Sequence, residues 1–369
     1  MRLQFIYKKL LLFIFLLAFQ PFSEVFGQTE DNPFYFYEGK PYGSEAIFNP
    51  LTVIINGGFG IMQINNRSNN LGSVNYKNGY HNVMYNLARP LEVISQFGWK
   101  RFLTREVVPT SIQPRNAQYV PNYELHMIGG GFTYRAFIDW FRWNNYPRPR
   151  LWALTSWFGY HFLNEVVENN AYVGPNVDPI SDIYIFNTLG LILFSFDRVA
   201  RFFGNNLHMQ DWSFMPGYDP VLNTIENNGQ NFIIKIRLPY LEPWSYFYHW
   251  GVNGMFGLSY QRKNGTSFSF AGGVLAKDLI NVPNNSGVRE LTTTLVWTAG
   301  IFYDRNNSLL TSLILAGTKG YKARLNIYPG IFNFGRLSPG FFFNLRSDNQ
   351  IVVGLHLNFL PVGIATRMN

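Results

Sequence analysis

The chain has 369 residues, of which 18% are aromatic and only 14% charged, with a formal net charge of +8 and no cysteine. A typical soluble domain carries about 25% charged residues, so this chain has too few charges to coat one or two ordinary soluble domains. The lack of cysteine excludes disulfides, thiolate metal sites and a lipid-modified cysteine.

The N-terminus has the pattern of a secretory signal peptide. Basic residues near the start precede an apolar core, Leu10–Phe19, and a small-residue cleavage site, Val25–Gly27. An uncleaved anchor helix is less favoured because the core is too short to span a bilayer and Pro21 follows it. We therefore predict that residues 1–27 are removed and that residues 28–369 form a single domain.

The first half of the chain mixes helical and extended patterns. Leu51–Ile64 fits a strand or an amphipathic helix, and roughly Pro90–Arg105 fits a helix. Alternating side chains predict a strand over Tyr123–Arg135.

Two consecutive helices are predicted between about residues 149 and 204. The first begins at Pro149 and ends near Asn169. The second has Asp178 as its N-cap and Pro179 at its first position, and it can run to Phe203 before the stop at Gly204. Acidic and amide residues along the second helix indicate that lipid is not its usual partner.

This helix pair holds the residues that could carry chemistry. His161 and Glu165 are four apart and share a helix face, which Glu168 continues. Asp182 and Asn187 lie on the second helix. His161, Glu165 and Asp182 are the candidate catalytic residues, because a histidine and carboxylates in a partly dry interior can act as general base and orienting acid. The same groups could instead tie the two helices together.

The pair resembles VanZ-like and related bacterial membrane families, in which an acidic helix is followed by an Asp-Asn-Gly pattern, here Asp182, Asn187 and Gly190. The resemblance covers about 35 of the 369 residues. It implies that the two helices lie close together.

The second half shows short segments with a period of two, separated by turn residues. In Ile351–Phe359 and Tyr321–Ile327 the odd positions are apolar and the even ones mostly small, polar or charged. The same alternation occurs in Phe232–Leu238, Phe268–Val274 and Leu291–Tyr303. We predict about nine strands from residue 231 onward and about 12 in all.

We expect the apolar rows to face lipid and the polar rows to face an enclosed interior, with Lys235, Arg237, Lys322 and Arg324 pointing inward. A soluble β-sandwich or a lipocalin-like barrel also alternates, but it needs a charged outer surface that this composition does not provide. Mean hydropathy is −0.05, and no apolar run after the N-terminus approaches the roughly 20 residues of a spanning helix.

The predicted fold is therefore an all-β transmembrane barrel of about 12 antiparallel strands, with helices from the first half in its lumen or at its mouth. The composition resembles outer-membrane proteins of the Bacteroidota, which implies the outer membrane of a Gram-negative bacterium. Expected partners are outer-membrane lipid, lipopolysaccharide and other outer-membrane proteins. The scattered basic residues do not indicate nucleic acid.

Three functions fit this prediction. The first is a structural or accessory component of the envelope, the second a lumenal enzyme acting on lipid or lipopolysaccharide, and the third a passive channel for small solutes. No nucleophile elbow, paired His-Glu zinc motif, phosphate loop or dinucleotide fingerprint occurs in the sequence, so we expect neither a metal nor a cofactor.

Overall fold

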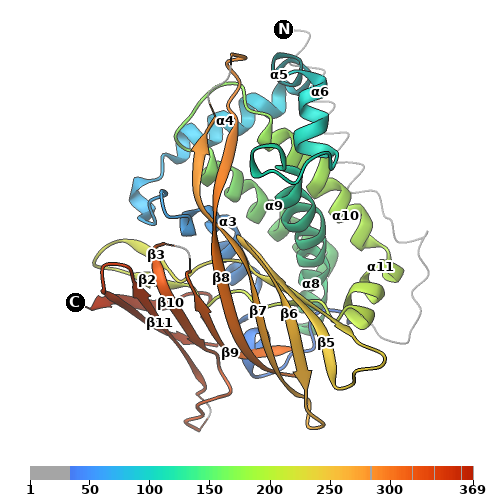
Figure 1. Ribbon diagram of the computed structural model, residues 1–369, viewed down its shortest axis with the longest axis vertical. Helices are drawn as coiled ribbons and strands as arrows, with labels where there is room; N and C mark the ends of the chain where they lie inside the picture. The colour runs from blue at the N-terminus through green and yellow to red at the C-terminus, as the bar shows by residue number, and fades with distance from the viewer. Residues whose placement is uncertain (1–33, 283–284, 318, 336, 359, 369) are drawn as a thin grey trace.

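The computed structural model describes residues 34–282, 285–317, 319–335, 337–358 and 360–368. They divide into a helical first half and a second half that forms a single large sheet (Figure 1). The predicted signal peptide lies outside the described residues.

Helices occupy residues 43–206 of the described chain. The α-helices are α2 (Gly43–Ile47), α3 (Pro50–Gly58), α4 (Tyr76–Ala88), α5 (Pro90–Phe97), α6 (Trp99–Phe102), α7 (Tyr119–Pro121), α8 (Gly130–Trp143), α9 (Pro149–Glu168), α10 (Thr188–Ser195) and α11 (Asp197–Arg201). Wider π-helical turns form η3 (Leu103–Val107), η5 (Asn122–Gly129), η6 (Ile180–Asn187) and η7 (Phe202–Asn206). Short 3₁₀ turns form η1 (Gly60–Gln63), η2 (Leu71–Ser73) and η4 (Pro114–Asn116).

Proline starts three of the α-helices, because its fixed φ and its missing N–H suit the first helical position. Pro50, Pro90 and Pro149 stand at or beside the first position of α3, α5 and α9. The side chain of Asn49 caps α3 by accepting a hydrogen bond from the Thr52 amide. The helices predicted over Pro90–Arg105 and from Pro149 are therefore present.

The second predicted helix, from Asp178 to Phe203, is divided. It consists of η6, α10, α11 and η7, and the chain turns by 87° between Ile180–Ser195 and Asp197–Asn206. Among the described residues, no single helix is long and apolar enough to span a membrane. The two parts of this bent pair together have the length and apolar composition of such a span.

The strand predicted over Tyr123–Arg135 is wrong, because these residues form η5 and the start of α8. The alternation of polar and apolar residues in this segment is short, and Gly129, Gly130 and Gly131 follow it and allow close helix packing. A Cβ on Gly131 would lie 2.3 Å from the ring of Phe194. Leu51–Ile64 is also helical, as α3 and η1, and not a strand.

The second half forms a 13-stranded sheet whose order is β1-β4-β5-β6-β7-β8-β9-β10-β11-β12-β13-β2-β3. The strands are β1 (Gln210–Asp211), β2 (Gly217–Asp219), β3 (Thr224–Glu226), β4 (Phe232–Arg237), β5 (Trp244–Trp250), β6 (Asn253–Gln261), β7 (Thr266–Asn281), β8 (Leu291–Arg305), β9 (Ser308–Leu315), β10 (Tyr321–Ile327), β11 (Pro339–Arg346), β12 (Ile351–Leu357) and β13 (Gly363–Met368). All neighbouring pairs are antiparallel except β13 and β2. Ten of these strands, β4 to β13, follow residue 231, where we predicted about nine.

The sheet is open, so the described strands do not form the closed barrel that we predicted. The two edge strands of the sheet, β1 and β3, nevertheless belong to one hairpin, which spans residues 210–237. In this hairpin β1 pairs with β4, and β2 pairs with β3. Between these pairs the amides of Trp212 and Phe214 donate to the carbonyls of Asn231 and Gly229. This hairpin connects the two edges of the sheet.

The two faces of the sheet differ as predicted. Phe268 and Phe270 on β7 and Trp297 and Ile301 on β8 are exposed on the outer face, whereas the intervening Ser269 is buried. The inner face buries polar side chains and an apolar cluster that includes Trp212, Phe302 and Phe342, and the list of its buried polar residues includes Ser245, His249, Ser259, Ser267, Asp304, Arg324, Asn326, Asn344 and His356.

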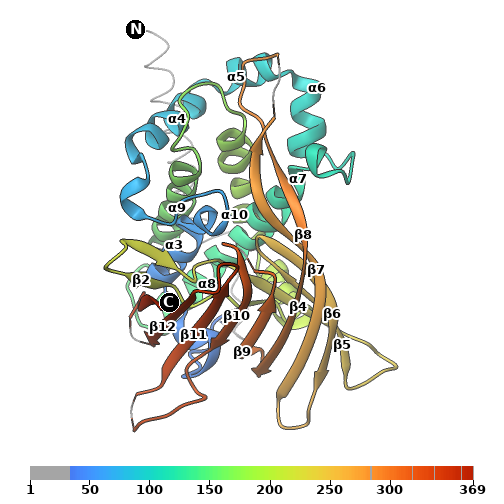
Figure 2. The same ribbon diagram turned by 60° about the vertical axis from the view of Figure 1, so that its left-hand side comes forward.

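The helices gather on one side of the sheet, and α5 and α6 lie beside the far end of the β7–β8 hairpin (Figure 2). The long hairpin of β7 and β8 reaches these helices, where Glu290 forms ion pairs with Arg101 and Arg105. A second apolar cluster joins α8 and α9 to the sheet, with Phe132, Phe137 and Trp157 packed together with Phe232.

Candidate functional site

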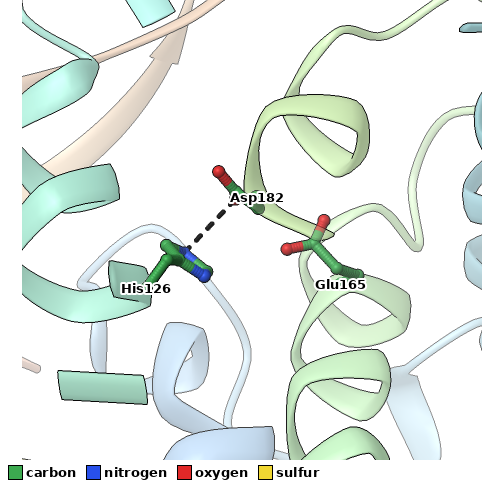
Figure 3. Close-up of side chains that lie close together, drawn as sticks. All are labelled: His126, Glu165 and Asp182. Atoms are coloured by element: carbon green, nitrogen blue, oxygen red, sulfur yellow. Dashed lines mark ion pairs between the residues drawn. The ribbon is translucent and has the colours of Figure 1, made fainter. Parts of the chain in front are cut away.

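A histidine and two carboxylates meet inside the helical half. His126 on η5, Glu165 on α9 and Asp182 on η6 converge from three separate elements (Figure 3). One ligand atom of each residue lies within 4.8 Å of the others, and His126 Nε2 is 3.3 Å from Asp182 Oδ2. Glu165 is fully buried, Asp182 is 3% exposed, and the side chain of His126 is 14% exposed.

Close helix packing brings these elements together. The helix α9 packs on α8, and η6 with α10 packs on η5, which continues into α8. A Cβ on Gly130 would lie 2.8 Å from His161 Nε2, and one on Gly190 would lie 2.3 Å from the Met127 carbonyl oxygen. Both His126 and Asp182 lie in π-helical segments, a conformation that recurs at functional sites.

Neighbouring polar side chains hold the three groups in place. His126 Nδ1 lies 3.1 Å from Asn187 Oδ1. The hydroxyl of Ser181 donates to Asp182 Oδ1 at 3.1 Å, and Asn169 Nδ2 donates to Glu165 Oε2 at 3.3 Å. These contacts use His126 Nδ1, Asp182 Oδ1 and Glu165 Oε2, so the other nitrogen of the histidine and the other oxygen of each carboxyl group are left for the centre of the cluster.

Burial changes the protonation of the whole cluster. It raises the pKa of Glu165 and of Asp182 well above the usual range, and further acidic neighbours add to the effect, foremost Asp182 for Glu165 and Asp178 for Asp182. Burial lowers the pKa of His126 and of the nearby His161. The histidines are therefore neutral near pH 7, and the two carboxyl groups strongly disfavour being ionised together.

Two more carboxyl groups adjoin this cluster. Burial, reinforced by the charge of Asp178, raises the pKa of Glu106 and of Glu168 to about 8. Arg67 and Arg289 offset part of this negative charge at Glu168, and the guanidinium of Arg289 donates to Asn169 Oδ1 at 2.8 Å. The region is thus acidic overall, with its nearest cations at the edge.

The structure brings together three residues that the sequence singled out: Glu165, Asp182 and Asn187. His161 lies beside them, with its ring centre 5.8 Å from that of His126, and both of its nitrogens lack a hydrogen-bond partner among the described residues. Glu168 is partly buried one turn farther along α9. The two predicted helices therefore meet through side chains, with η5 and α8 packed beside both.

The four predicted inward cations lie elsewhere, in the sheet. Lys235 is buried and paired with Asp304 at 2.7 Å. Arg237 is exposed at the end of β4, where it lines a cavity of about 360 Å³ with Lys235. Arg324 is buried against the ring of Phe214. Lys322 is exposed, because the register of β10 shifts between Tyr321 and Ala323 and turns its side chain outward.

His126 is the residue that sequence reasoning missed. It lies in the segment Tyr123–Arg135, for which the sequence predicts a strand, so its proximity to the helix pair is not expected from the sequence. A helical interpretation of residues 122–143, supported by Pro121 at the start, would have placed a histidine on a third buried helix. Its pairing with Asp182 is a tertiary contact that no sequence spacing reveals.

Comparison of the chain with protein-family models, with curated proteins and with solved structures found no match. The function is therefore inferred from the residues of this chain.

Two chemical roles fit the cluster. Carboxylates this close to one another either share a proton or hold a cation between them. The cavities of about 360 and 190 Å³ are lined by residues other than His126, Glu165 and Asp182, so the cluster does not lie in either of them.

Proposed function

We propose that this chain is an outer-membrane protein of a Gram-negative bacterium with a structural or accessory role in the envelope. The outer face of its sheet contacts lipid, and its helices cover the inner face. Its candidate partners are outer-membrane lipid, lipopolysaccharide and other outer-membrane proteins.

The exposed apolar face of the sheet carries this proposal. The outward positions of β7 from Phe268 to Val274 are Phe, Phe, Gly and Val, and those of β8 from Leu295 to Ile301 are Leu, Trp, Ala and Ile. Trp297 is 80% exposed. Each Å² of such surface kept in water costs about 25 cal/mol, and monomeric soluble proteins rarely expose a continuous apolar patch of this kind.

The buried polar network on the inner face also supports the proposal. Asn227 donates to Asn326 at 2.8 Å, Asn326 donates to Ser312 at 3.2 Å, and Arg367 forms an ion pair with Glu226 at 2.8 Å. An apolar outside and a polar inside are the pattern of strands that face lipid.

The edges of the sheet are protected, as lipid requires. The hairpin of residues 210–237 connects the edges, and the outer side of β3 pairs with residues 69–71 through the Ile225 amide and the Asn69 carbonyl. We infer that this hairpin and the helices complete the wall that the strands leave open.

Membrane fractionation tests the proposal. We expect the mature protein, produced in a Gram-negative host, to sediment with the outer membrane, to resist extraction by alkaline carbonate and to be released by detergent. Recovery in the aqueous fraction without detergent would contradict it.

The enzyme remains the alternative, supported by the convergence of Glu165 and Asp182 beside His161. A passive channel is less favoured, because bulky side chains such as Trp212, Phe302 and Phe342 pack together on the inner side of the sheet.

A further inference from the structure

The buried cluster has the donor set of a metal site. It offers one imidazole nitrogen and two carboxylate oxygens, and these atoms lie within 4.8 Å of one another. We propose that His126, Glu165 and Asp182 bind one divalent transition-metal ion of the zinc, manganese or ferrous class. This proposal does not depend on the membrane location proposed above, and it departs from the sequence analysis, which predicted no metal.

Hydrogen-bond accounting provides the first argument. The amide oxygen of Asn187 can only accept, so its 3.1 Å contact places the imidazole proton of His126 on Nδ1. The neutral ring then presents the lone pair of Nε2, which lies 3.3 Å from the acceptor oxygen Oδ2 of Asp182. Two acceptors at this distance need either a proton or a metal ion between them.

Glu165 provides the second, independent argument. Its Oε1 is fully buried and accepts no hydrogen bond from an N–H or hydroxyl group of the described residues, while the carboxyl group of Asp182 lies within hydrogen-bonding reach of that of Glu165. Leaving a buried carboxylate oxygen without a partner costs several kcal/mol, so native proteins rarely do it. A cation at the centre of the cluster would satisfy Glu165 Oε1, Asp182 Oδ2 and His126 Nε2 together.

The surroundings of the three groups match those of known metal centres. Ligating histidines usually direct their other ring nitrogen at an oxygen acceptor, and ligating carboxylates are themselves hydrogen-bonded. Here Asn187 provides the oxygen acceptor for Nδ1 of His126. Ser181 donates a hydrogen bond to Asp182, and Asn169 donates one to Glu165.

The donor types select the class of ion. Imidazole with carboxylates suits Zn²⁺, Mn²⁺ and Fe²⁺, whereas soft ions such as Cu(I) prefer the sulfur of thiolates and thioethers. Three protein ligands leave further coordination positions for water or for His161, whose nitrogens lack a hydrogen-bond partner among the described residues. Because the ligands come from η5, α9 and η6, the ion would also link three segments of the helical half.

Metal titration tests the proposal without any assay of activity. The full mature protein is purified in detergent and stripped with a chelator. Co²⁺ is then added while visible absorption is recorded, and Zn²⁺ binding is measured by equilibrium dialysis. We expect one ion per chain, and Asp182→Asn and His126→Gln should each weaken binding at least tenfold.

Asp139→Asn is the matched control, because it removes a buried helical carboxylate outside the cluster and should leave binding unchanged. If Asp182→Asn fails to fold, as judged by near-ultraviolet circular dichroism, Glu165→Gln takes its place. The proposal is overturned if the stripped wild-type protein takes up neither Co²⁺ nor Zn²⁺, as expected for a plain hydrogen bond between His126 and Asp182. It is also overturned if the folded variants bind as well as the wild type does.

Discussion

Asp139 anchors the start of the described chain. Its Oδ2 accepts hydrogen bonds from the amides of Tyr35 and Phe36 at 2.8 and 2.9 Å, while its other oxygen has no hydrogen-bond partner among the described residues. Burial raises the pKa of this carboxyl group to about 6, although Arg135 and the two amides oppose the shift. A single side chain in α8 thus holds Tyr35 and Phe36, about 100 residues away in the sequence, although its burial disfavours the charged form of the carboxyl group.

This shift predicts how stability depends on pH. The pKa in the unfolded chain is about 3.9, so between about pH 4 and pH 6 the folded state retains a proton that the unfolded chain has released. The contribution of Asp139 to the free energy of unfolding therefore falls as pH rises through this window, by on the order of 2–3 kcal/mol.

Asp139→Asn mimics the protonated group and keeps an oxygen for both amides. Thermal unfolding in detergent should show the variant equal to wild type near pH 4 and more stable near pH 7. A difference between the two proteins that is the same at both pH values would contradict this account.

At the level of single residues, the sequence identified most of the buried cluster but not its centre. Glu165, Asp182 and Asn187 could be found because they lie on two well-marked helices. His126 could not, because the contact that matters is between η5 and η6, which are more than 50 residues apart in the sequence. The protonation of the cluster depends on burial, which only the packed structure determines.

Among the helices, glycine decides how closely two of them approach. Gly79 in α4 faces α9, and a Cβ at this position would lie 1.9 Å from the carbonyl oxygen of Val166. Gly159, in α9 itself, is exposed, and a Cβ there would meet nothing within 4 Å. The two positions are a matched pair for testing the packing of α4 on α9.

Alanine substitution should have opposite effects at these two positions. Gly79→Ala should destabilise the protein by about 1–3 kcal/mol, because the backbone of α9 has to move. Gly159→Ala should stabilise it by about 0.5–1 kcal/mol through helix propensity alone. Denaturant unfolding of the two variants checks this, and equal effects in the same direction would exclude the close approach of α4 and α9.

The strands of the second half were more predictable than the helices of the first. Period-two alternation runs along most of β8, from residue 295 to residue 305, and is also seen in β12, because these stretches have one more exposed and one more buried face. Almost every residue of α8 is buried, so polar residues do not mark one face of this helix in the sequence. The β-bulge that turns Lys322 outward also left no signal, since a one-residue shift depends on pairing with β11.

Over the whole molecule, the sheet separates two environments. Its inner side packs on the helices and on the hairpin of residues 210–237, and its outer side exposes apolar side chains such as Phe268, Phe270, Trp297 and Ile301. The helical half holds the buried acidic cluster away from that surface, on elements that do not belong to the sheet. The lipid contact that we propose for the outer side would account for both the low charge of the chain and the direction in which its apolar rows point.

Fluorescence quenching by lipid tests this contact most directly. Because the chain has no cysteine, Trp297→Cys and Tyr240→Cys each create a unique attachment point for a fluorophore. Trp297 lies on the outer face of β8, whereas Tyr240, 97% exposed, lies in the turn between β4 and β5. In vesicles containing lipids brominated on their acyl chains, we predict strong quenching at position 297 and little at position 240. Equally weak quenching at both positions would contradict the account.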